Sequence, residues 1–288
     1  MSSLSSLPYR GVGIGLRDEI AKETLSNHDI IDTLEIITEN YFSPKKQEIL
    51  GEASALFPVI PHGVELSIGS AEALENDFLK NVKDVCMRVN AAYYSDHFAI
   101  TRLGDKKIGH LSPIWFTKDS LSLVVDKINR VQDFLGIPLV LENITSFFVI
   151  PDADFTEAEF IAEACRRTGC GLLLDITNVH INAYNSQSDP YAFLKTFPLE
   201  SVVHIHLAGG VIRDNWFHDT HSHELNGINE GVWPLFEWVL SHTPNIKTVI
   251  IERDENFKSD FEEMIGKDVR RIRELIQSYP HHPHSQPV

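Results

Sequence analysis

The stretch GLLLDIT (171–177) shows the pattern that decides the fold, a short apolar run that leads directly into a polar residue, here a carboxylate. Comparable apolar runs recur at fairly even intervals along the chain, at 11–16, 33–38, 58–64, 92–100, 138–144, 202–208 and 248–253. Nearly continuous apolar runs are typical of parallel strands that are covered on both faces. With 171–177 the runs number eight, which predicts a closed (β/α)₈ TIM barrel rather than a doubly wound sheet.

Helical spacing fills most gaps between the predicted strands. It is clearest in 70–90, 118–135, 156–168, 230–241 and 258–278. Thr117 or Asp119 suits the N-cap of the second of these, and Thr156 with Glu159 suits that of the third. Since no Gly-, Ser- or Pro-rich linker interrupts 10–278, we expect one domain there, with flexible termini at 1–9 and 279–288.

The charge balance of the 288-residue chain is acidic, with 25 Lys and Arg against 41 Asp and Glu and a net charge of −16. Such a field repels a nucleic-acid backbone, so we expect no nucleic-acid partner. No apolar run reaches the roughly 18 to 20 residues that cross a bilayer, and the Ser-rich start lacks signal-peptide character. Three cysteines predict no disulfide framework. We therefore expect a cytoplasmic protein without a membrane partner.

Metal-binding residue types end six of the predicted strands. They are His62, His97, Glu142, Asp175, His206 and Glu252. Singly, each is more often a cap or an ion-pair partner, but the carboxyl ends of barrel strands meet at one rim. An uncompensated carboxylate there would cost several kcal/mol, which a divalent cation offsets. Imidazole and carboxylate without cysteine suit zinc, iron or manganese.

Three further candidate ligands are Asn178, Asp219 and His221. Asp219 and His221 are two residues apart, so both can face one way in an extended loop. Because one octahedral ion takes about six ligands, the enlarged set predicts about two or three ions. His204 precedes His206 by two residues and faces the same side one layer deeper, so we expect it in the core or supporting a ligand. His180, His218 and His223 are candidate proton carriers or solvated side chains.

Ordered sequence blocks from about residue 10 to 257 carry a family resemblance. They are GIGLR (13–17), TENYF (38–42), HGVELSIGS (62–70), SDH (95–97), LENI (141–144), RTGCGLLLDITN (167–178), HLAG (206–209), DTH (219–221), VWPL (232–235) and IERD (251–254). With these blocks the chain resembles the multinuclear non-haem iron-dependent oxidative enzymes of the xylose-isomerase-like TIM-barrel superfamily.

The resemblance implies a cluster of two or three irons at the rim. One iron would take His62, His97 and Glu142, and a second would share Glu142 with Asp175, His206 and Glu252. A third, more labile site would use Asn178, Asp219 and His221. The catalytic group would be Glu142, Asp175, His206 and Glu252. Family members use dioxygen to modify ribosomally made precursor peptides, usually at cysteine, and a second protein commonly presents the leader peptide.

Two departures from the family pattern affect the pocket wall. Many members carry Asn-Asn-Val-Tyr where this chain has 177–180, and many carry Glu-Trp-Asp where it has 252–254. The candidate ligands survive both changes. We expect Asn143, His180, Arg253 and Asp254 to support the ligands or to contact the substrate.

Three alternative functions follow from the same residues. A zinc-dependent endonuclease of this superfamily would want a basic surface and a His where this chain has Asn178, and the net charge of −16 disfavours it. A sugar isomerase would want a substrate-binding lysine, which the rim motifs do not supply. A non-catalytic peptide-binding module is disfavoured by the intact ligand set. The basic stretch 102–107 is expected to be a solvated loop.

Overall fold

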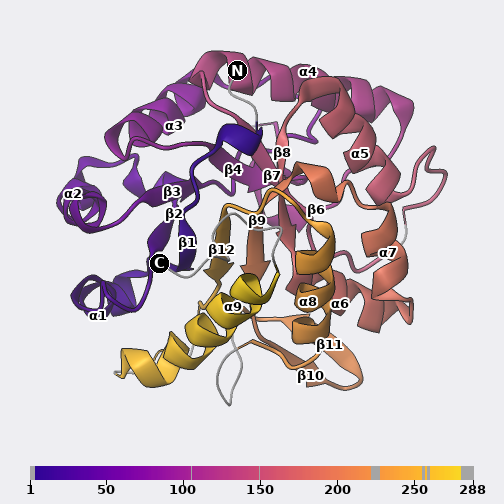
Figure 1. The fold of residues 1–288 in the computed structure, drawn as a ribbon. Helices are drawn as coiled ribbons and strands as arrows, with labels where there is room; N and C mark the ends of the chain where they lie inside the picture. Colours follow the sequence, from indigo (N-terminus) through magenta and orange to yellow (C-terminus); the bar gives the residue numbers. More distant parts are fainter. Residues whose placement is uncertain are drawn as a thin grey trace.

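A computed structural model describes residues 4–279, apart from 105, 149, 222–227, 255–256 and 258–259. Parallel strands close into a barrel in the order β1-β12-β9-β8-β7-β4-β3-β2 (Figure 1). They are β1 (Gly11–Gly15), β2 (Thr33–Ile37), β3 (Val59–His62), β4 (Tyr94–His97), β7 (Leu139–Glu142), β8 (Gly171–Asp175), β9 (Val202–Leu207) and β12 (Thr248–Ile251). The TIM barrel predicted from the apolar runs is confirmed, and each strand lies inside its predicted range.

Helices surround the barrel and cover its outer face (Figure 1). They are α1 (Ala21–Ser26), α2 (Gln47–Leu56), α3 (Asn76–Arg88), α4 (Lys118–Leu135), α5 (Glu157–Thr168), α6 (Ile176–Ser186), α7 (Pro190–Thr196), α8 (Val232–His242) and α9 (Lys267–Ser278), with a π-helical turn at Glu262–Gly266 before α9. Short 3₁₀ turns occupy Leu4–Ser6, Asp18–Ile20, Thr38–Tyr41, Pro44–Lys46 and Leu199–Ser201. Capping boxes begin α4 at Thr117 and α5 at Thr156, as the sequence predicts.

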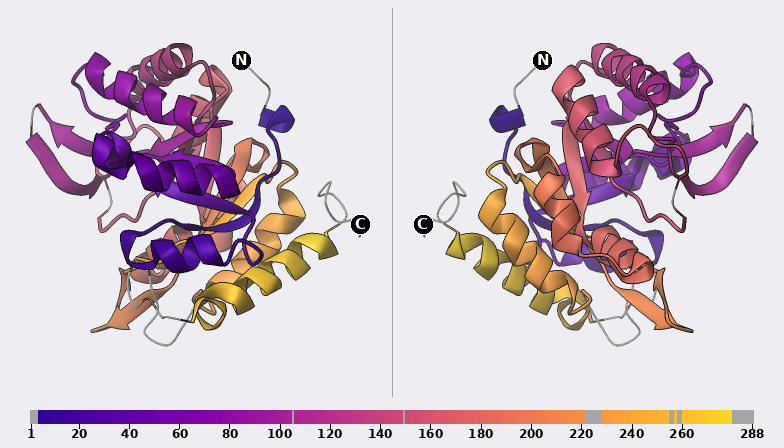
Figure 2. Two further views of the ribbon diagram at one scale, coloured as in Figure 1. Left: turned by 90° about the vertical axis from the view of Figure 1, so that its left-hand side faces the viewer. Right: turned by 90° about the vertical axis from the view of Figure 1, so that its right-hand side faces the viewer.

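Two antiparallel hairpins extend the loops at the carboxyl ends of barrel strands. β5 (Ile100–Leu103) pairs with β6 (Lys106–Ser112) after β4, and β10 (Gly210–Arg213) pairs with β11 (Trp216–Asp219) after β9. Both project from the same side of the barrel (Figure 2). The stretch 102–107, expected to be a loop, therefore belongs to a hairpin. The two strands of this hairpin are adjacent in the chain. Each is short and lacks the continuous apolar run that predicts a barrel strand.

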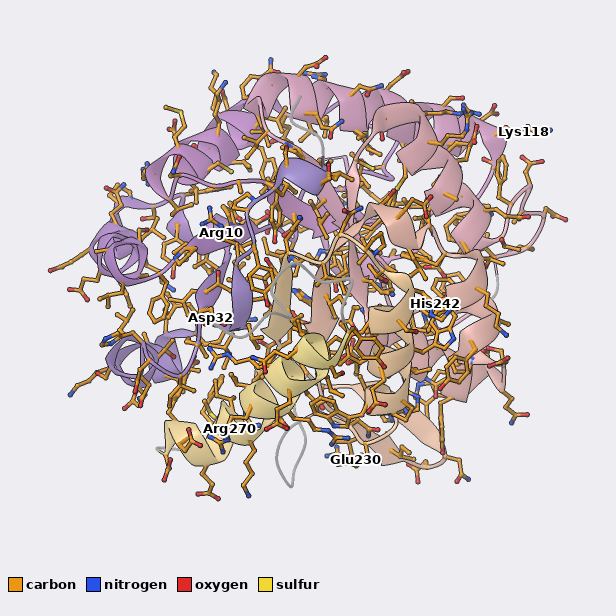
Figure 3. All side chains as sticks on the ribbon, in the orientation of Figure 1. Arg10, Asp32, Lys118, Glu230, His242 and Arg270 are labelled. Carbon is orange, nitrogen blue, oxygen red and sulfur yellow. The ribbon has the colours of Figure 1, made fainter. Side chains whose placement is uncertain are left out.

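The barrel interior is filled at the amino-terminal end of the strands by a small apolar cluster. Its buried members are Leu7, Ile60, Tyr93, Val140, Leu173 and Val203, with Leu4 packed against them. Leu4 and Leu7 thus pack against the barrel, and the flexibility expected of 1–9 and 279–288 stays a prediction. A larger apolar core lies between barrel and helices. Exposed charged side chains such as Lys118, Glu230 and Arg270 lie at the periphery (Figure 3).

The strand at 171–177 ends earlier than predicted, at Asp175. Asp175 Oδ1 accepts a hydrogen bond from the backbone N–H of Asn178 at 2.8 Å, so this carboxylate is also the N-cap of α6. A side-chain acceptor of this kind satisfies one of the free N–H groups that begin a helix. The cap therefore turns the chain directly from strand to helix and holds Asn178 close to Asp175.

The capping box of α4 has a measurable energetic consequence. Thr117 Oγ1 accepts from the Ser120 N–H at 3.2 Å, and Ser120 Oγ accepts from the Thr117 N–H at 3.1 Å. We expect Thr117→Ala to lower the free energy of unfolding by about 1 kcal/mol in urea titrations. Thr117→Ser, which keeps the hydroxyl, should stay close to the parent protein. Equal stability of the alanine and serine variants would contradict this role for the hydroxyl.

Candidate metal centre

The six candidate ligands that end barrel strands come together at the carboxyl rim. Strand register places His97 beside Glu142 and Asp175 beside His206. All six side chains are buried, from 0% exposure for Asp175 and His206 to 7% for His97 and Glu252. Each lies at or just beyond the end of its strand, which is why residues from distant parts of the sequence meet here.

His62, His97 and Glu142 form the first group. His62 Nε2 and His97 Nε2 lie 3.4 Å and 3.2 Å from the same oxygen, Glu142 Oε2. The other ring nitrogens are already engaged, since His62 Nδ1 lies 3.0 Å from Ser95 Oγ and His97 Nδ1 lies 3.1 Å from the Gly63 carbonyl oxygen. Partners on Nδ1 leave Nε2 as the ligating atom and fix the orientation of each ring.

Glu142, Asp175, His206 and Glu252 form the second group. Each offers one ligand atom, and these atoms all lie within 4.8 Å of one another. His206 Nδ1 lies 3.3 Å from Glu252 Oε2 and 3.5 Å from Glu142 Oε1. Glu142 thus belongs to both groups, with Oε2 facing the first and Oε1 facing the second. A carboxylate in this position can bridge two cations.

The third candidate group, Asn178, Asp219 and His221, adjoins the second. His221 Nε2 lies 3.1 Å from Asp219 Oδ1 and 3.6 Å from Glu252 Oε2. The Asp219 and His221 side chains are 18% and 29% exposed, so this group lies closer to solvent than the other two. Asp219 comes from hairpin strand β11 rather than from a barrel strand. The structure therefore brings Asp219 and His221 beside the second group, and it ties Asn178 to Asp175 through the Asn178 backbone N–H.

The chemistry of the buried atoms fits cations. Among the described residues, several buried side-chain atoms lack a hydrogen-bond partner, and six of them belong to candidate ligands: Glu142 Oε2, Asp175 Oδ2, Asn178 Oδ1, His206 Nδ1, Asp219 Oδ1 and Glu252 Oε2. Leaving such groups unpaired costs about 1–3 kcal/mol each, and more for charged ones. A metal ion accepts lone pairs from all of them. Oxygen and imidazole donors without thiolate suit iron, zinc or manganese.

Burial and charged neighbours shift the pKa values of the buried site residues. Burial, followed by the charges of Glu142 and Glu252, raises the pKa of Asp175 well above its usual range. Burial and the neighbouring imidazoles lower the pKa of His62. Burial opposes charge on His97, but Glu142 and further carboxylates outweigh it and raise its pKa to about 9. Without metal, protons therefore partly offset the carboxylate charge that cations would balance.

Glu35 is a site residue that the sequence reasoning missed. It is 2% exposed in the middle of β2, and its Oε2 lies 3.1 Å from His206 Nε2. Burial raises its pKa, although His206 opposes the shift. The contact leaves His206 Nδ1 to face the second group. The signal in the sequence is a glutamate inside the apolar run TLEII (33–37). It was missed because the prediction covered only residues at the ends of strands.

Asp96 is a second missed support. It accepts from the Tyr94 hydroxyl at 2.8 Å through Oδ2 and from the His97 backbone N–H at 2.8 Å through Oδ1. Gly63 packs so tightly here that a Cβ would lie 1.9 Å from the Tyr94 hydroxyl and 2.3 Å from Asp96 Oδ2. Gly63 and Asp96 thus fix the backbone next to His62 and His97, the two histidines of the first group.

Asn143 and Asp254 support candidate ligands. Asn143 exchanges two 3.0 Å hydrogen bonds with the backbone of Asp175, one in each direction. Asp254 Oδ2 lies 3.0 Å from His221 Nδ1, and its Oδ1 accepts from Arg17 Nε at 2.7 Å. These contacts hold Asp175 and His221 in place, and Asp254 also lines the cavity that reaches the candidate ligands.

The remaining residues singled out in the sequence lie around the candidate ligands, and His204 lies next to His206, with ring centroids 4.8 Å apart. Arg253 is 3% exposed and lies within the electrostatic reach of Asp268, and burial lowers its pKa. The His180 ring meets the edge of Phe217 with centroids 5.4 Å apart, so its described ring contact is with the β11 hairpin. His204 is fully buried, with Nδ1 3.3 Å from the Tyr93 hydroxyl and Nε2 3.6 Å from Glu35, as expected for a deeper layer. His218 is exposed, and His223 lies outside the described residues.

A cavity of about 380 Å³ opens above the ligand groups. Its lining includes His62, His97, His221 and Glu252 on one side and the β6 segment Gly109–Leu111 on the other. Arg17 and Lys107 also line it. A substrate can therefore reach the candidate ligands between the rim and the first hairpin. None of the helices within the described ranges has the length and apolar character that a membrane span requires.

Solved structures with the same fold are distant in sequence. D-psicose 3-epimerase from Clostridium cellulolyticum matches with a TM-score of 0.57 at 12% identity, over 90% of this chain and 89% of that one. Endonuclease IV from Thermus thermophilus matches with a TM-score of 0.56 at 17% identity, over 94% of this chain and 100% of that one. At these identities the likeness concerns the fold alone.

Sequence relatives and a family model give a closer assignment. A UPF0276 protein from Anaeromyxobacter sp. is 36% identical over 242 residues, covering 83% of this chain and 84% of the relative. A UPF0276 protein from Caulobacter vibrioides is 33% identical over 269 residues, covering 92% and 95%. The family model described as "RiPP precursor modification enzyme MbnB/TglH/ChrH" matches residues 11–277. The chain therefore belongs to this family of RiPP precursor modification enzymes, in agreement with the resemblance to multinuclear non-haem iron enzymes.

Proposed function

We propose that this protein is a multinuclear non-haem iron oxidoreductase that uses dioxygen to modify a ribosomally made precursor peptide at a cysteine. The observation that carries the proposal is the convergence of the buried ligand atoms of Glu142, Asp175, His206 and Glu252, with Glu142 shared by a second group, and each of these four residues has a buried side-chain atom without a hydrogen-bond partner. Membership of a RiPP precursor modification family supports a peptide as the substrate. Iron, dioxygen, cysteine and a leader-presenting partner protein are part of the proposal.

The ligand roles follow the three groups of side chains. His62, His97 and Glu142 would hold one iron, and Asp175, His206 and Glu252 would hold a second with Glu142 between them. Asn178, Asp219 and His221 would hold a third. When bound, iron would lower the pKa of a thiol and would supply redox chemistry with dioxygen. The chain itself orients its imidazoles, limits water through burial and admits the peptide from the cavity above the rim.

The first test is metal content. After expression in iron-rich medium, we expect about two to three irons per chain by plasma mass spectrometry, because the ligands exceed what one ion takes. Glu142→Gln should lower occupancy of both principal sites, since this carboxylate is shared, whereas Asp219→Asn should lower only the third. Glu274→Gln removes the same charge from an exposed residue of α9 and is the matched control. Stoichiometric zinc, or no metal in the parent protein, would contradict the iron assignment.

The second test concerns Glu35 as a positioning residue. Glu35→Leu removes the acceptor of His206 Nε2–H and should weaken iron binding by about 10- to 100-fold in chelator competition, the usual effect of losing such a partner. Glu35→Gln keeps an acceptor and should retain most of the affinity. Because the change leaves buried His206 Nε2 without its acceptor, metal-free Glu35→Leu should melt below metal-free parent protein, and iron affinity is therefore compared at a temperature where both are folded. Equal iron affinity of the two variants would rule out this positioning role.

The third test is turnover. Iron-loaded protein should change the mass of a short cysteine-containing peptide encoded beside its gene in air and not under strict anaerobiosis. Replacing the peptide cysteine by serine should abolish the change, and Glu252→Gln should reduce it at least as strongly as it reduces iron content. A mass change in the absence of dioxygen, or one retained by the serine peptide, would refute the proposed chemistry.

A further inference from the structure

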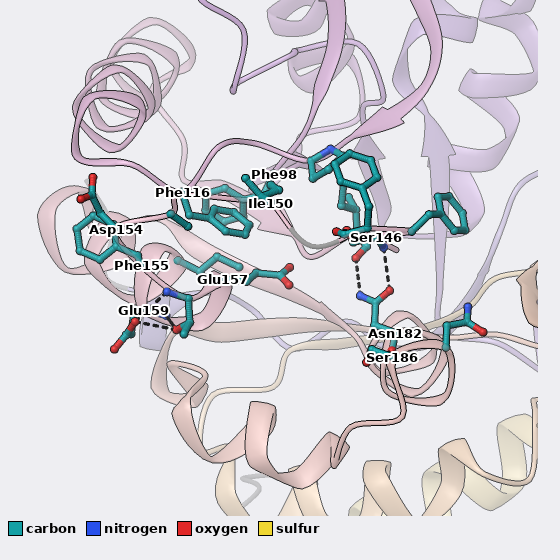
Figure 4. Close-up of a pocket in the computed structure, with 18 of the residues that line it drawn as sticks. Phe98, Phe116, Ser146, Ile150, Asp154, Phe155, Glu157, Glu159, Asn182 and Ser186 are labelled. Atoms are coloured by element: carbon teal, nitrogen blue, oxygen red, sulfur yellow. Dashed lines mark hydrogen bonds between the residues drawn. The ribbon is translucent and has the colours of Figure 1, made fainter.

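A second cavity lies beside the metal centre rather than above it. It has a volume of about 770 Å³ and is enclosed by the loops after β4 and β7, the start of α5, the middle of α6 and hairpin strand β11. Figure 4 shows its side chains. A volume of this size falls in the range of small-molecule sites and exceeds what one side chain fills. The candidate ligand groups do not use it.

Its walls continue directly from the candidate ligands. Phe98 follows the ligand His97, and Ile144 lies two residues beyond the ligand Glu142. Asn182 lies one helical turn after Asn178 on α6, and it holds the loop by accepting from the Ser146 N–H at 2.8 Å. An extended chain advances about 3.3–3.6 Å per residue. Because Phe98 and Ile144 are at most two residues from candidate ligands, a peptide residue at the ligands would have its neighbours within a few residues' length of the cavity wall.

The lining is dominated by aromatic side chains. Phe98, Phe116, Phe147, Phe155 and Trp216 line the cavity, and the Phe147 and Trp216 ring centroids are 6.3 Å apart. Phe147 and its neighbour Phe148 are each 56% exposed, so the mouth presents apolar rings to solvent. Aromatic faces favour both apolar side chains and cations placed over the ring.

Three carboxylates accompany these rings, and they differ in their partners. Asp154 Oδ2 accepts from the Lys118 N–H at 2.9 Å, and Glu159 Oε2 accepts from Thr156 in the capping box. Glu157 is partly buried, and burial raises the pKa of its carboxyl to about 7. Its carboxylate points between the aromatic rings and the Ser146–Asn182 pair (Figure 4). A cation in the cavity would offset the cost of burying this charge.

We propose that this cavity binds a segment of the peptide substrate in which a basic residue lies next to a bulky apolar residue, with Glu157 pairing with the basic side chain. The inference rests on the proposed function, because it takes the occupant to be the substrate peptide. The apolar residue packs on the rings and the basic one meets the carboxylate. The acidic balance of the chain, with a net charge of −16, attracts such a peptide at long range.

The test uses acetyl-Phe-Arg-amide as the probe and acetyl-Phe-citrulline-amide as its neutral isostere, titrated calorimetrically into iron-loaded full-length protein. We expect the arginine probe to bind about tenfold more tightly than the citrulline probe, as a charge-assisted pair allows. Glu157→Gln should abolish this preference, and Glu274→Gln, the matched change outside the cavity, should keep it. Trp216→Ala should weaken both probes severalfold.

Each outcome decides a separate point. Equal affinity for the two probes, or a preference that survives Glu157→Gln, overturns the inference. Unchanged affinities in Trp216→Ala place the probe elsewhere and overturn it as well. Iron content is measured on the same samples. Iron-loaded protein that fails to discriminate refutes this inference alone, whereas protein that prefers the arginine probe but binds no iron refutes the proposed function.

Discussion

The structure depends on one electrostatic constraint, the burial of several carboxylates in contact with one another at the barrel rim. Glu142, Asp175 and Glu252 are each 7% exposed or less and face a common point. The nearby arginine, Arg17, is bound to Asp254 instead. Burial and mutual repulsion make such a group costly unless positive charge enters it. The proposed cations answer this constraint, and the same carboxylates would be their ligands.

A layer of less conspicuous contacts prepares the imidazoles for metal. One ring nitrogen of each histidine has a partner: Ser95 for His62, the Gly63 carbonyl for His97 and Glu35 for His206. The other nitrogen of each ring is directed at the shared carboxylate of Glu142. Because these partners belong to the barrel strands or their immediate ends, ligand geometry is fixed by the fold. Little rearrangement is needed on binding, which favours affinity.

The sequence predicted the barrel and a cluster of candidate ligands at one rim because both follow from local pattern. An apolar run that ends in His, Asp or Glu specifies strand, burial and rim position together, as at Asp175. Glu35 was missed because a mid-strand carboxylate acquires meaning only when a strand far away, β9, brings His206 against it. The hairpin at 100–112 was missed because its two short strands carry no continuous apolar run, and the aromatic cavity was missed because it arises where separate loops meet.

The wide spacing of the ligands along the chain has a consequence for biosynthesis. The second group joins Glu142 to Glu252, and strand β12, which precedes Glu252, must pair with both β9 and β1 before the barrel closes. Contacts of such long sequence separation form late in folding, after a large loop-closure cost. During translation, therefore, the proposed iron cluster cannot assemble until the chain beyond Glu252 has left the ribosome. A truncated or partly made chain would lack the complete ligand set, and so would not expose a reactive iron pair to oxygen.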